Sequence, residues 1–191
     1  MKTKMQPATY IYPLPLGLIG AYDCDGKANF MVVSYIGPLN HEPPVISVSM
    51  GKAHHTNSCI EETKVFSVNI PSKAMIAAVD YAGSVSGSDT DKSKLFKITR
   101  GEFGAPLIDS CPISLECRLD QVLEYEHNKA YVGEIVNAYV DEDVLVEGLP
   151  DMRKVDPLLF SMHNFQYFGL GEKLGQVWTL APTFVPPADG V

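Results

Sequence analysis

The sequence predicts a mainly-β protein with a few helices, arranged as a closed antiparallel barrel. Two observations carry this prediction. Many short segments alternate apolar and polar residues, and Gly, Pro and Asp separate these segments along the chain. Helix-start signals are few by comparison. The length of 191 residues, with neither an internal repeat nor a linker in the sequence, predicts one domain over residues 1–191.

The chain opens with a predicted hairpin. Residues 16–22 and 28–35 are two apolar runs, and Asp25-Gly26 lies between them. This dipeptide favours a type I′ turn, which needs positive φ at both central positions. We therefore expect residues 16–35 to form two paired antiparallel strands.

A third strand is predicted over residues 45–50. Pro43-Pro44 fixes an extended entry into it and cannot donate to a sheet ladder. Within the strand, Ser47 and Ser49 share one face and Val48 and Met50 share the other. This strand should therefore present a small polar face.

A polar segment then predicts a short helix. Thr56 and Ser58 are alternative N-caps, and Ser58 with Glu61 fits a capping box. Residues 64–70 alternate again, and Pro71 ends that predicted strand.

A second helix is predicted over residues 74–81, with Ser72 as its cap and Gly83 at its end. Residues 83–94 consist mainly of Gly, Ser, Asp, Thr and Lys, so they predict a loop. A loop of this length is functional or mobile.

A second group of strands follows. The predicted strands are residues 113–119, 122–126 and 130–140, with a turn at 127–129. Residues 141–143 indicate a solvated turn, because three consecutive carboxylates point in different directions. The C-terminal tail is rich in aromatic residues and glycine from Phe165 to Trp178, and regular structure is expected to end at Pro182, Pro186 and Pro187.

The composition limits the partners. Hydrophobic residues make up 46% of the chain and charged residues 20%, which is ordinary for a protein with a core. The net charge of −8 disfavours nucleic acid and anionic membranes as partners. No apolar run reaches the roughly 18 residues of a membrane helix. No apolar stretch follows the N-terminal lysines either, so a cytoplasmic location is predicted.

The four cysteines predict buried reduced thiols. Cys24, Cys59, Cys111 and Cys117 contain no C-x-x-C pair. Cys111 and Cys117 on one strand would lie about 20 Å apart, which is too far for a disulfide. Cys24, beside a turn, is expected to be the most exposed.

Several catalytic patterns are absent from the sequence. It has no Walker A loop, no G-x-S-x-G elbow and no zinc-type Cys/His spacing. Gly169 to Gly175 is one residue too long for a dinucleotide fingerprint, and His54-His55 would face opposite sides of an extended chain. With no acid–base pair in evidence, a bound cofactor is expected to carry the reactivity, and no metal site is expected.

Motifs along the chain resemble one known family. They are Asp25-Gly26-x-x-Asn29, Ser34, Pro43-Pro44-x-Ile-Ser-Val-Ser, His55-Thr56-Asn57, Phe66-Ser-Val-Asn69-Ile and Asp91-Lys92. Their order and spacing resemble the flavin reductase-like, FMN-binding split-barrel family, with the flavoredoxin branch the most similar. The resemblance covers about residues 10–170.

This resemblance implies a six-stranded antiparallel split barrel of the Greek-key type. It implies a homodimer with FMN bound noncovalently near the dimer interface, and a C-terminal tail that contacts the partner. The preferred function is an oxidoreductase in which NADH or NADPH passes a hydride to flavin N5. Three alternatives stay open: an electron carrier with bound FMN and a protein donor, a flavin-binding module without turnover, and flavin chemistry on an organic substrate beneath the 83–94 loop.

The resemblance also assigns candidate cofactor residues. Each has a structural alternative, such as core packing, helix capping or solvent exposure. Val33 is expected to be a packing residue. Asn128 or Tyr131, and Phe165 or Tyr167, are candidates that could come from the partner subunit. The candidates beside the flavin ring are Asn29, Phe30, Met31, Val32, Ser34, Tyr35, Ser47, Val48, Ser49 and Phe165; those for the phosphate are Lys52, His55, Thr56, Asn57 and Lys92.

Overall fold

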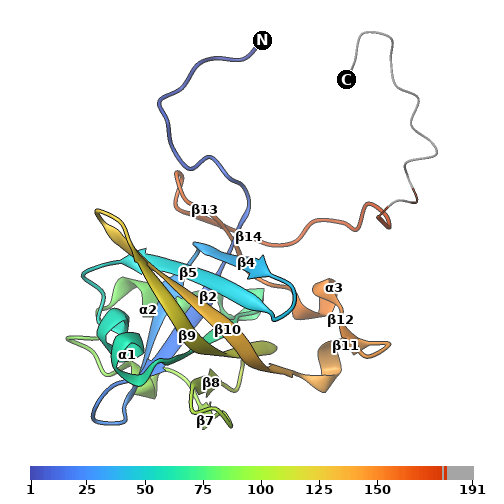
Figure 1. Cartoon of the computed structure of the whole chain (residues 1–191). Helices are drawn as coiled ribbons and strands as arrows, with labels where there is room; N and C mark the ends of the chain where they lie inside the picture. The colour runs from blue at the N-terminus through green and yellow to red at the C-terminus, as the bar shows by residue number, and fades with distance from the viewer. Residues whose placement is uncertain (178, 180–191) are drawn as a thin grey trace.

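One antiparallel sheet of seven strands forms the body of the protein, in the order β3-β2-β6-β9-β10-β5-β4. We analysed a computed structural model, which describes residues 1–177 and 179. Trp178, Pro182, Pro186 and Pro187 therefore lie outside the described residues. The strands of the main sheet are β2 Gly17–Tyr22, β3 Ala28–Val33, β4 Ile36–Asn40, β5 Val45–Gly51, β6 Val65–Ile70, β9 Ile113–Glu124 and β10 Asn128–Val140 (Figure 1).

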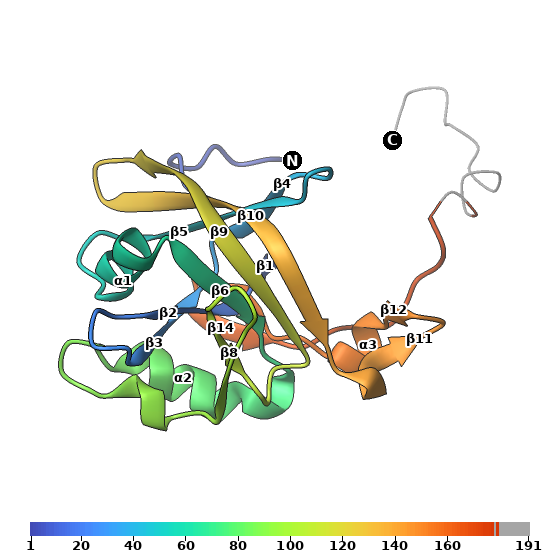
Figure 2. The ribbon, with the colours of Figure 1, turned by 60° about the horizontal axis from the view of Figure 1, so that its bottom comes forward.

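Smaller elements surround this sheet. One three-stranded sheet and two hairpins account for the other strands, and the helices lie at the ends and on one side of the main sheet (Figure 2). Their bounds are β1 Leu14–Pro15, β7 Ile98–Arg100, β8 Pro106–Ile108, β11 Leu145–Val146, β12 Leu149–Pro150, β13 Leu159–Ser161, β14 Gln166–Phe168, α1 Thr56–Thr63, α2 Ile76–Ser84 and α3 Met152–Val155, with 3₁₀ turns at Lys73–Met75, Lys92–Lys94 and Glu142–Val144.

The sheet is strongly curled because its two edge strands are neighbours in the chain. Only Ser34 and Tyr35 join β3 to β4, and the carbonyl of Tyr35 accepts a hydrogen bond from the Ser49 amide at 2.9 Å. If β3 and β4 are counted as one bent strand, the main sheet has the six strands that the resemblance implied. The mainly-β split-barrel fold is confirmed, but the sheet is open between β3 and β4 instead of fully closed.

The first hairpin forms as predicted, with a different turn. Asp23 to Lys27 make a longer loop between β2 and β3, in which the Asp23 amide bonds to the Lys27 carbonyl at 2.9 Å. Gly26 has φ of 74°, while Asp25 is not among the residues with positive φ. The type I′ assignment was therefore wrong. The sequence prediction also missed β4 and extended β3 two residues too far.

The predicted capping of α1 was wrong. The helix begins at Thr56, but its N-cap residue is His55, and no side chain caps it. The Ser58 hydroxyl donates to the His55 carbonyl at 2.8 Å, inside the helix. Glu61 accepts from the Tyr131 hydroxyl at 2.8 Å and so cannot close a capping box. The Glu61 carboxylate, which the capping box required, is bound instead by a residue from a distant strand.

Two other boundaries moved. Helix α2 spans Ile76–Ser84, so Gly83 lies inside its last turn, and Ser72 makes no capping bond to the 3₁₀ turn before it. Residues 113–124 form one long strand, because irregular register steps opposite β10 keep the pairing continuous. In the described part of the chain the thiols of Cys59, Cys111 and Cys117 are buried and Cys24 is exposed, which confirms the expected exposure.

Two apolar clusters lie on opposite faces of β2. Ile19 points into the barrel, where it packs with Val48 and Phe66. Its neighbour Leu18 points outward, into a second cluster that includes Phe30. Helix α2 covers that second cluster through Val79 and Ala82, and Figure 2 shows this helix lying under β2 and β3. Within the described residues, no helix is long and apolar enough to cross a membrane. The cytoplasmic location stays a prediction.

Candidate functional site

The candidate site follows β3 at the edge of the sheet. Because β3 pairs only with β2 in its sheet, its outer side faces other elements: α2, the loop after it and the Lys92–Lys94 turn. Two pockets lie along this side. Ala28 and Asn29, at the start of β3, line the first pocket, whereas Val32 and the following Ser34 line the second.

The first pocket, which we call the polar pocket, has a volume of about 300 Å³. Polar side chains from four parts of the chain meet in it: the β2–β3 loop, the start of β3, the start of α1 and the loop before Lys92. Its lining residues are Asp23, Lys27, Ala28, Asn29, His55, Gly87, Ser88, Asp89, Thr90, Asp91 and Lys92.

Lys92 supplies a buried positive charge to the polar pocket. It is only 6% exposed, and its Nζ donates to the Ala82 carbonyl at 2.8 Å. Among the described residues no carboxylate pairs with it, and the neighbouring Asp91 lies 3.6 Å from Lys94 instead. Burial lowers the pKa of Lys92. A buried ammonium without a counter-charge is costly, and a bound anion would relieve that cost.

Two buried polar side chains and one glycine shape the pocket beside β3. The Asn29 amide donates to the Thr56 hydroxyl at 2.7 Å, and the two residues are 6% and 1% exposed. A Cβ on Gly87 would lie 2.1 Å from Asn29 Oδ1, so only glycine allows the loop this close to the strand. The bond between Asn29 and Thr56 fixes β3 against the start of α1.

The start of α1 adds further positive potential. His55 lines the polar pocket, and α1, whose first residue is Thr56, directs its positive dipole end this way. Burial, and then the charge of Lys92, lower the pKa of the adjacent His54. The fields of Lys92 and the helix end therefore act on the same small region.

Two predicted phosphate residues lie elsewhere. Lys52 Nζ lies 3.6 Å from Glu124 on β9, and Lys52 lines neither pocket. The Asn57 amide donates to the carbonyls of Gly51 and His54 at 2.8 and 2.9 Å. Its Oδ1 accepts from the Tyr131 hydroxyl at 2.8 Å. Asn57 and Tyr131 therefore brace the turn before α1.

The predicted ring residues divide between core and pocket. Phe30 is fully buried and packs edge-on against Phe96, with ring centroids 5.7 Å apart. Met31 packs against the barrel core, as does Val33, which was expected to be a packing residue. Val32 and Ser34 line the second pocket.

Tyr35, in the link between β3 and β4, and the candidate residues of β5 lie away from both pockets. The Tyr35 hydroxyl is 3.0 Å from that of Thr9, and Val48 is fully buried in the barrel. The Ser47 hydroxyl donates to the Gly37 carbonyl at 3.2 Å, and the Asn128 amide donates to Ser49 at 3.3 Å. Tyr35 and the three β5 residues line neither pocket.

The second pocket, which we call the aromatic pocket, has a volume of about 420 Å³. Its base is Leu16, Val32 and Ser34. One wall is α2, through Asp80, Gly83 and Ser84, and the other is the β13–β14 hairpin, through Phe160, Met162, Phe165 and Tyr167. Phe165 and Tyr167 were both candidates from the sequence. Asp80 and Met162 were not, because neither lies in a motif.

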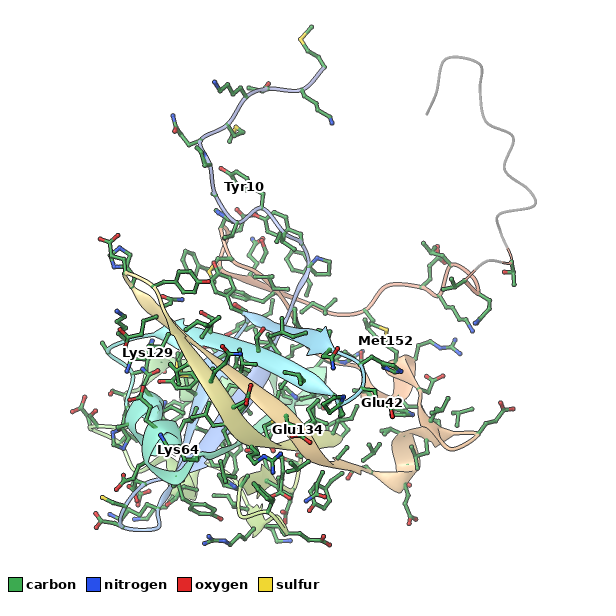
Figure 3. The ribbon with its side chains drawn as sticks, viewed as in Figure 1. Tyr10, Glu42, Lys64, Lys129, Glu134 and Met152 are labelled. Carbon is green, nitrogen blue, oxygen red and sulfur yellow. The ribbon has the colours of Figure 1, made fainter. Side chains whose placement is uncertain are left out.

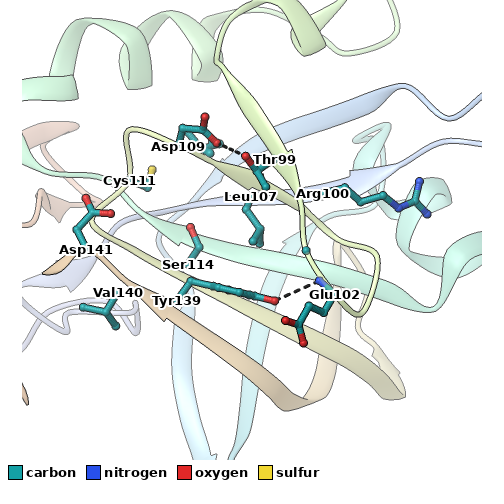
Figure 4. Close-up of a pocket in the computed structure, with 12 residues that line it drawn as sticks. Thr99, Arg100, Glu102, Leu107, Asp109, Cys111, Ser114, Tyr139, Val140 and Asp141 are labelled. Carbon is teal, nitrogen blue, oxygen red and sulfur yellow. Dashed lines mark hydrogen bonds between the residues drawn. The ribbon is translucent and has the colours of Figure 1, made fainter. Parts of the chain in front are cut away.

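Another pocket, of about 460 Å³, opens between the β7–β8 hairpin and β10 (Figure 4). Several of its polar groups already have partners. The Thr99 hydroxyl donates to Asp109 at 2.7 Å, and the Tyr139 hydroxyl accepts from the Glu102 amide at 3.1 Å. No candidate residue from the sequence lies in it, so we place the functional site along β3.

Comparison with known proteins identifies the class. A family model described as "Flavin reductase like domain" matches residues 9–169, so the chain belongs to this family. A flavoredoxin structure from Methanosarcina acetivorans is 40% identical, with a TM-score of 0.91 over 96% of this chain and 98% of that one. The flavoredoxin of Desulfovibrio vulgaris (Miyazaki F) is 36% identical, with a TM-score of 0.87 over 95% of this chain and 100% of that one.

A third structure supports the fold alone. A putative flavin reductase with a split barrel domain from Shewanella frigidimarina is 21% identical, with a TM-score of 0.76 over 87% of this chain and 86% of that one. The particular likeness is therefore to flavoredoxins, inside a broader group that shares the barrel.

Replacing Lys92 with Met should change how stability depends on pH. The folded-state pKa of Lys92 lies below its ordinary value of 10.5. Between these two pKa values the unfolded chain binds more protons, so the free energy of unfolding of the wild type should rise with pH in this window. Urea unfolding across the window measures this rise, and Lys92→Met should lack it.

Lys94→Met is the matched control, because the Lys94 side chain is 82% exposed. That variant should keep the wild-type rise. A Lys92→Met profile that runs parallel to the wild type would contradict the buried, unpaired charge.

Proposed function

We propose that this protein binds FMN noncovalently and works as an oxidoreductase. The observation that carries the proposal is the buried, unpaired charge of Lys92 at one end of β3. The polar pocket around it suits a phosphate, β3 offers the flavin a strand edge to lie along, and the aromatic pocket at the other end of β3 leaves room for a flat reaction partner. The family match and the two flavoredoxin structures support the same cofactor.

The proposal assigns a role to each end of β3. Lys92, His55 and the start of α1 would hold the phosphate, with Asn29 and Thr56 shaping the pocket beside it. The backbone from Met31 to Ser34 and the side chains of Val32 and Ser34 would lie along the flavin, while the side chains of Met31 and Val33 pack into the barrel core. Five residue steps lead from Asn29 to Ser34, about 16 Å of extended chain, which is the reach that a long ligand with one anionic end requires.

Bound FMN would accept and release electrons, and the protein would bind, orient and shield it. The proposal leaves out the side chains of Phe30, Tyr35, Ser47, Val48, Ser49, Lys52 and Asn57, which the fold commits to core packing and structural bonds or directs away from the two pockets.

Lys92→Met should weaken FMN binding about tenfold or more, as expected for loss of a buried charge-assisted contact. Riboflavin lacks the phosphate, so its affinity should change little. Fluorescence titration of both flavins measures the difference. Lys52→Met is the control and should bind FMN as the wild type does, because Lys52 lines neither pocket. An equal loss for the two flavins would remove Lys92 from phosphate binding.

Two electron donors fit the proposed cofactor. We infer hydride transfer from NADH or NADPH to flavin N5 as the first candidate, because the aromatic pocket beside β3 offers room for a flat donor. The second candidate is electron transfer from a protein donor to a retained FMN. The likeness to two flavoredoxins, at 40% and 36% identity, specifically favours it.

Anaerobic addition of NADH, and separately NADPH, to the FMN-loaded protein separates these candidates. A nicotinamide-dependent reductase should lose its oxidised flavin absorbance within seconds to minutes of mixing. An unchanged spectrum that dithionite then bleaches would contradict nicotinamide dependence and favour the protein donor.

We also propose a homodimer. The N-terminal segment and the β13–β14 hairpin expose apolar side chains side by side, among them Tyr10, Ile11, Tyr12 and Phe168 (Figure 3 labels Tyr10). Exposed apolar patches of this kind mark interfaces. Light scattering should give twice the chain mass of 20.9 kDa, and Ile11→Glu should reduce it. A monomer at all accessible concentrations would contradict the proposal.

A further inference from the structure

One wall of the aromatic pocket carries a negative charge that no cation balances. Asp80 is the charged side chain among the described residues that line this pocket. It forms no ion pair in the described part of the chain: Lys73, on the turn before α2, lies 2.7 Å from Asp156 instead. Asp80 Oδ1 accepts a hydrogen bond from the Tyr167 hydroxyl at 2.9 Å.

The nearest group on the hairpin that could become positive faces the other way. His163 follows Met162 in the β13–β14 turn, but its ring stacks on Tyr10 with centroids 4.7 Å apart. Its Nδ1 is 2.9 Å from the Tyr12 hydroxyl. The His163 side chain therefore belongs to the contact with the N-terminal segment, and it does not line the aromatic pocket.

The hairpin wall is mainly aromatic. Phe160 and Phe165 meet edge to face at 6.5 Å, and Phe160 also packs on Tyr167 at 5.8 Å. Burial, and then the bond to Asp80, raise the pKa of Tyr167 to about 12. Tyr167 therefore keeps its proton at neutral pH and stays a neutral donor to Asp80. The pocket combines aromatic surfaces with one carboxylate.

We propose that the aromatic pocket selects flat aromatic reaction partners that are neutral or positively charged and rejects anionic ones, with Asp80 as the specificity-determining residue. This inference rests on the proposed function, since the pocket serves a reaction partner only if FMN lies along β3. The physical reason is direct. Asp80 is an exposed residue at the pocket rim, and its carboxylate attracts a cation and repels an anion of the same shape.

Three redox-inert probes of nearly one shape test this charge selection. Benzamidine is cationic, benzamide is neutral and benzoate is anionic at neutral pH. Calorimetric titration of the FMN-loaded protein at low salt should give affinities in that order, with about a tenfold ratio between benzamidine and benzoate. In Asp80→Asn the ratio should fall towards one, while benzamide binding stays close to the wild type.

Asp120→Asn is the matched control, because it removes the same charge from an exposed position on β9, outside the aromatic pocket. It should keep the wild-type ratio. Benzoate binding as tightly as benzamidine, a ratio that Asp80→Asn leaves unchanged, or no binding of any probe would each overturn the inference.

The two proposals fail separately in this design. Calorimetry can measure the affinity of each probe for the protein both with and without bound FMN. A chain that takes up no FMN but keeps the charge order contradicts the proposed function, and with it the role of a reaction partner, while the charge preference of the pocket itself stands. A chain that binds FMN and shows no charge order contradicts only the selection by Asp80.

Discussion

The short link between β3 and β4 is the constraint on which the rest of the structure depends. Ser34 and Tyr35 alone connect the two edges of a seven-stranded sheet, so the sheet must curl until its ends approach. The curl encloses the barrel core on one side. It also leaves the outer edge of β3 to be covered by α2, the loop before Lys92 and the β13–β14 hairpin. Both pockets of the candidate site are consequences of that arrangement.

Two charged side chains are buried in the described residues, Lys92 and Glu116, and hydrogen bonds without an ion pair hold both. Every buried side-chain nitrogen and oxygen in the described residues has a hydrogen-bond partner. Glu116 shows the usual solution: fully buried, it accepts bonds from the Ala105 amide, the Asn137 amide and the Tyr139 hydroxyl. These bonds lower the pKa of Glu116 although burial opposes them. Lys92 has a single carbonyl partner and lines the polar pocket, where the proposed phosphate would supply the counter-charge that the described residues do not.

Charge is distributed unevenly along β3. The chain carries a net charge of −8, and the polar pocket sets the buried cation of Lys92 and a helix start among the carboxylates of Asp23, Asp89 and Asp91. At the other end of the strand, Asp80 gives the aromatic pocket a negative rim. A phosphate in the polar pocket would therefore contact Lys92 among several carboxylates, whereas a reaction partner in the aromatic pocket would meet the single carboxylate of Asp80.

The sequence by itself determined most of the strands along the chain, the hairpin at Asp25-Gly26 and the family, because alternation and turn residues act over a few neighbouring positions. It also marked Asn29, Thr56 and Lys92, which the fold gathers around one pocket. Tertiary structure alone decided the rest. The Glu61 carboxylate accepts a hydrogen bond from Tyr131 instead of closing a capping box, and Lys52 pairs with Glu124. Asp80 accepts a hydrogen bond from Tyr167, which lies 87 positions further along the chain. Long side chains choose among partners that only the folded chain brings near, and no local pattern records that choice.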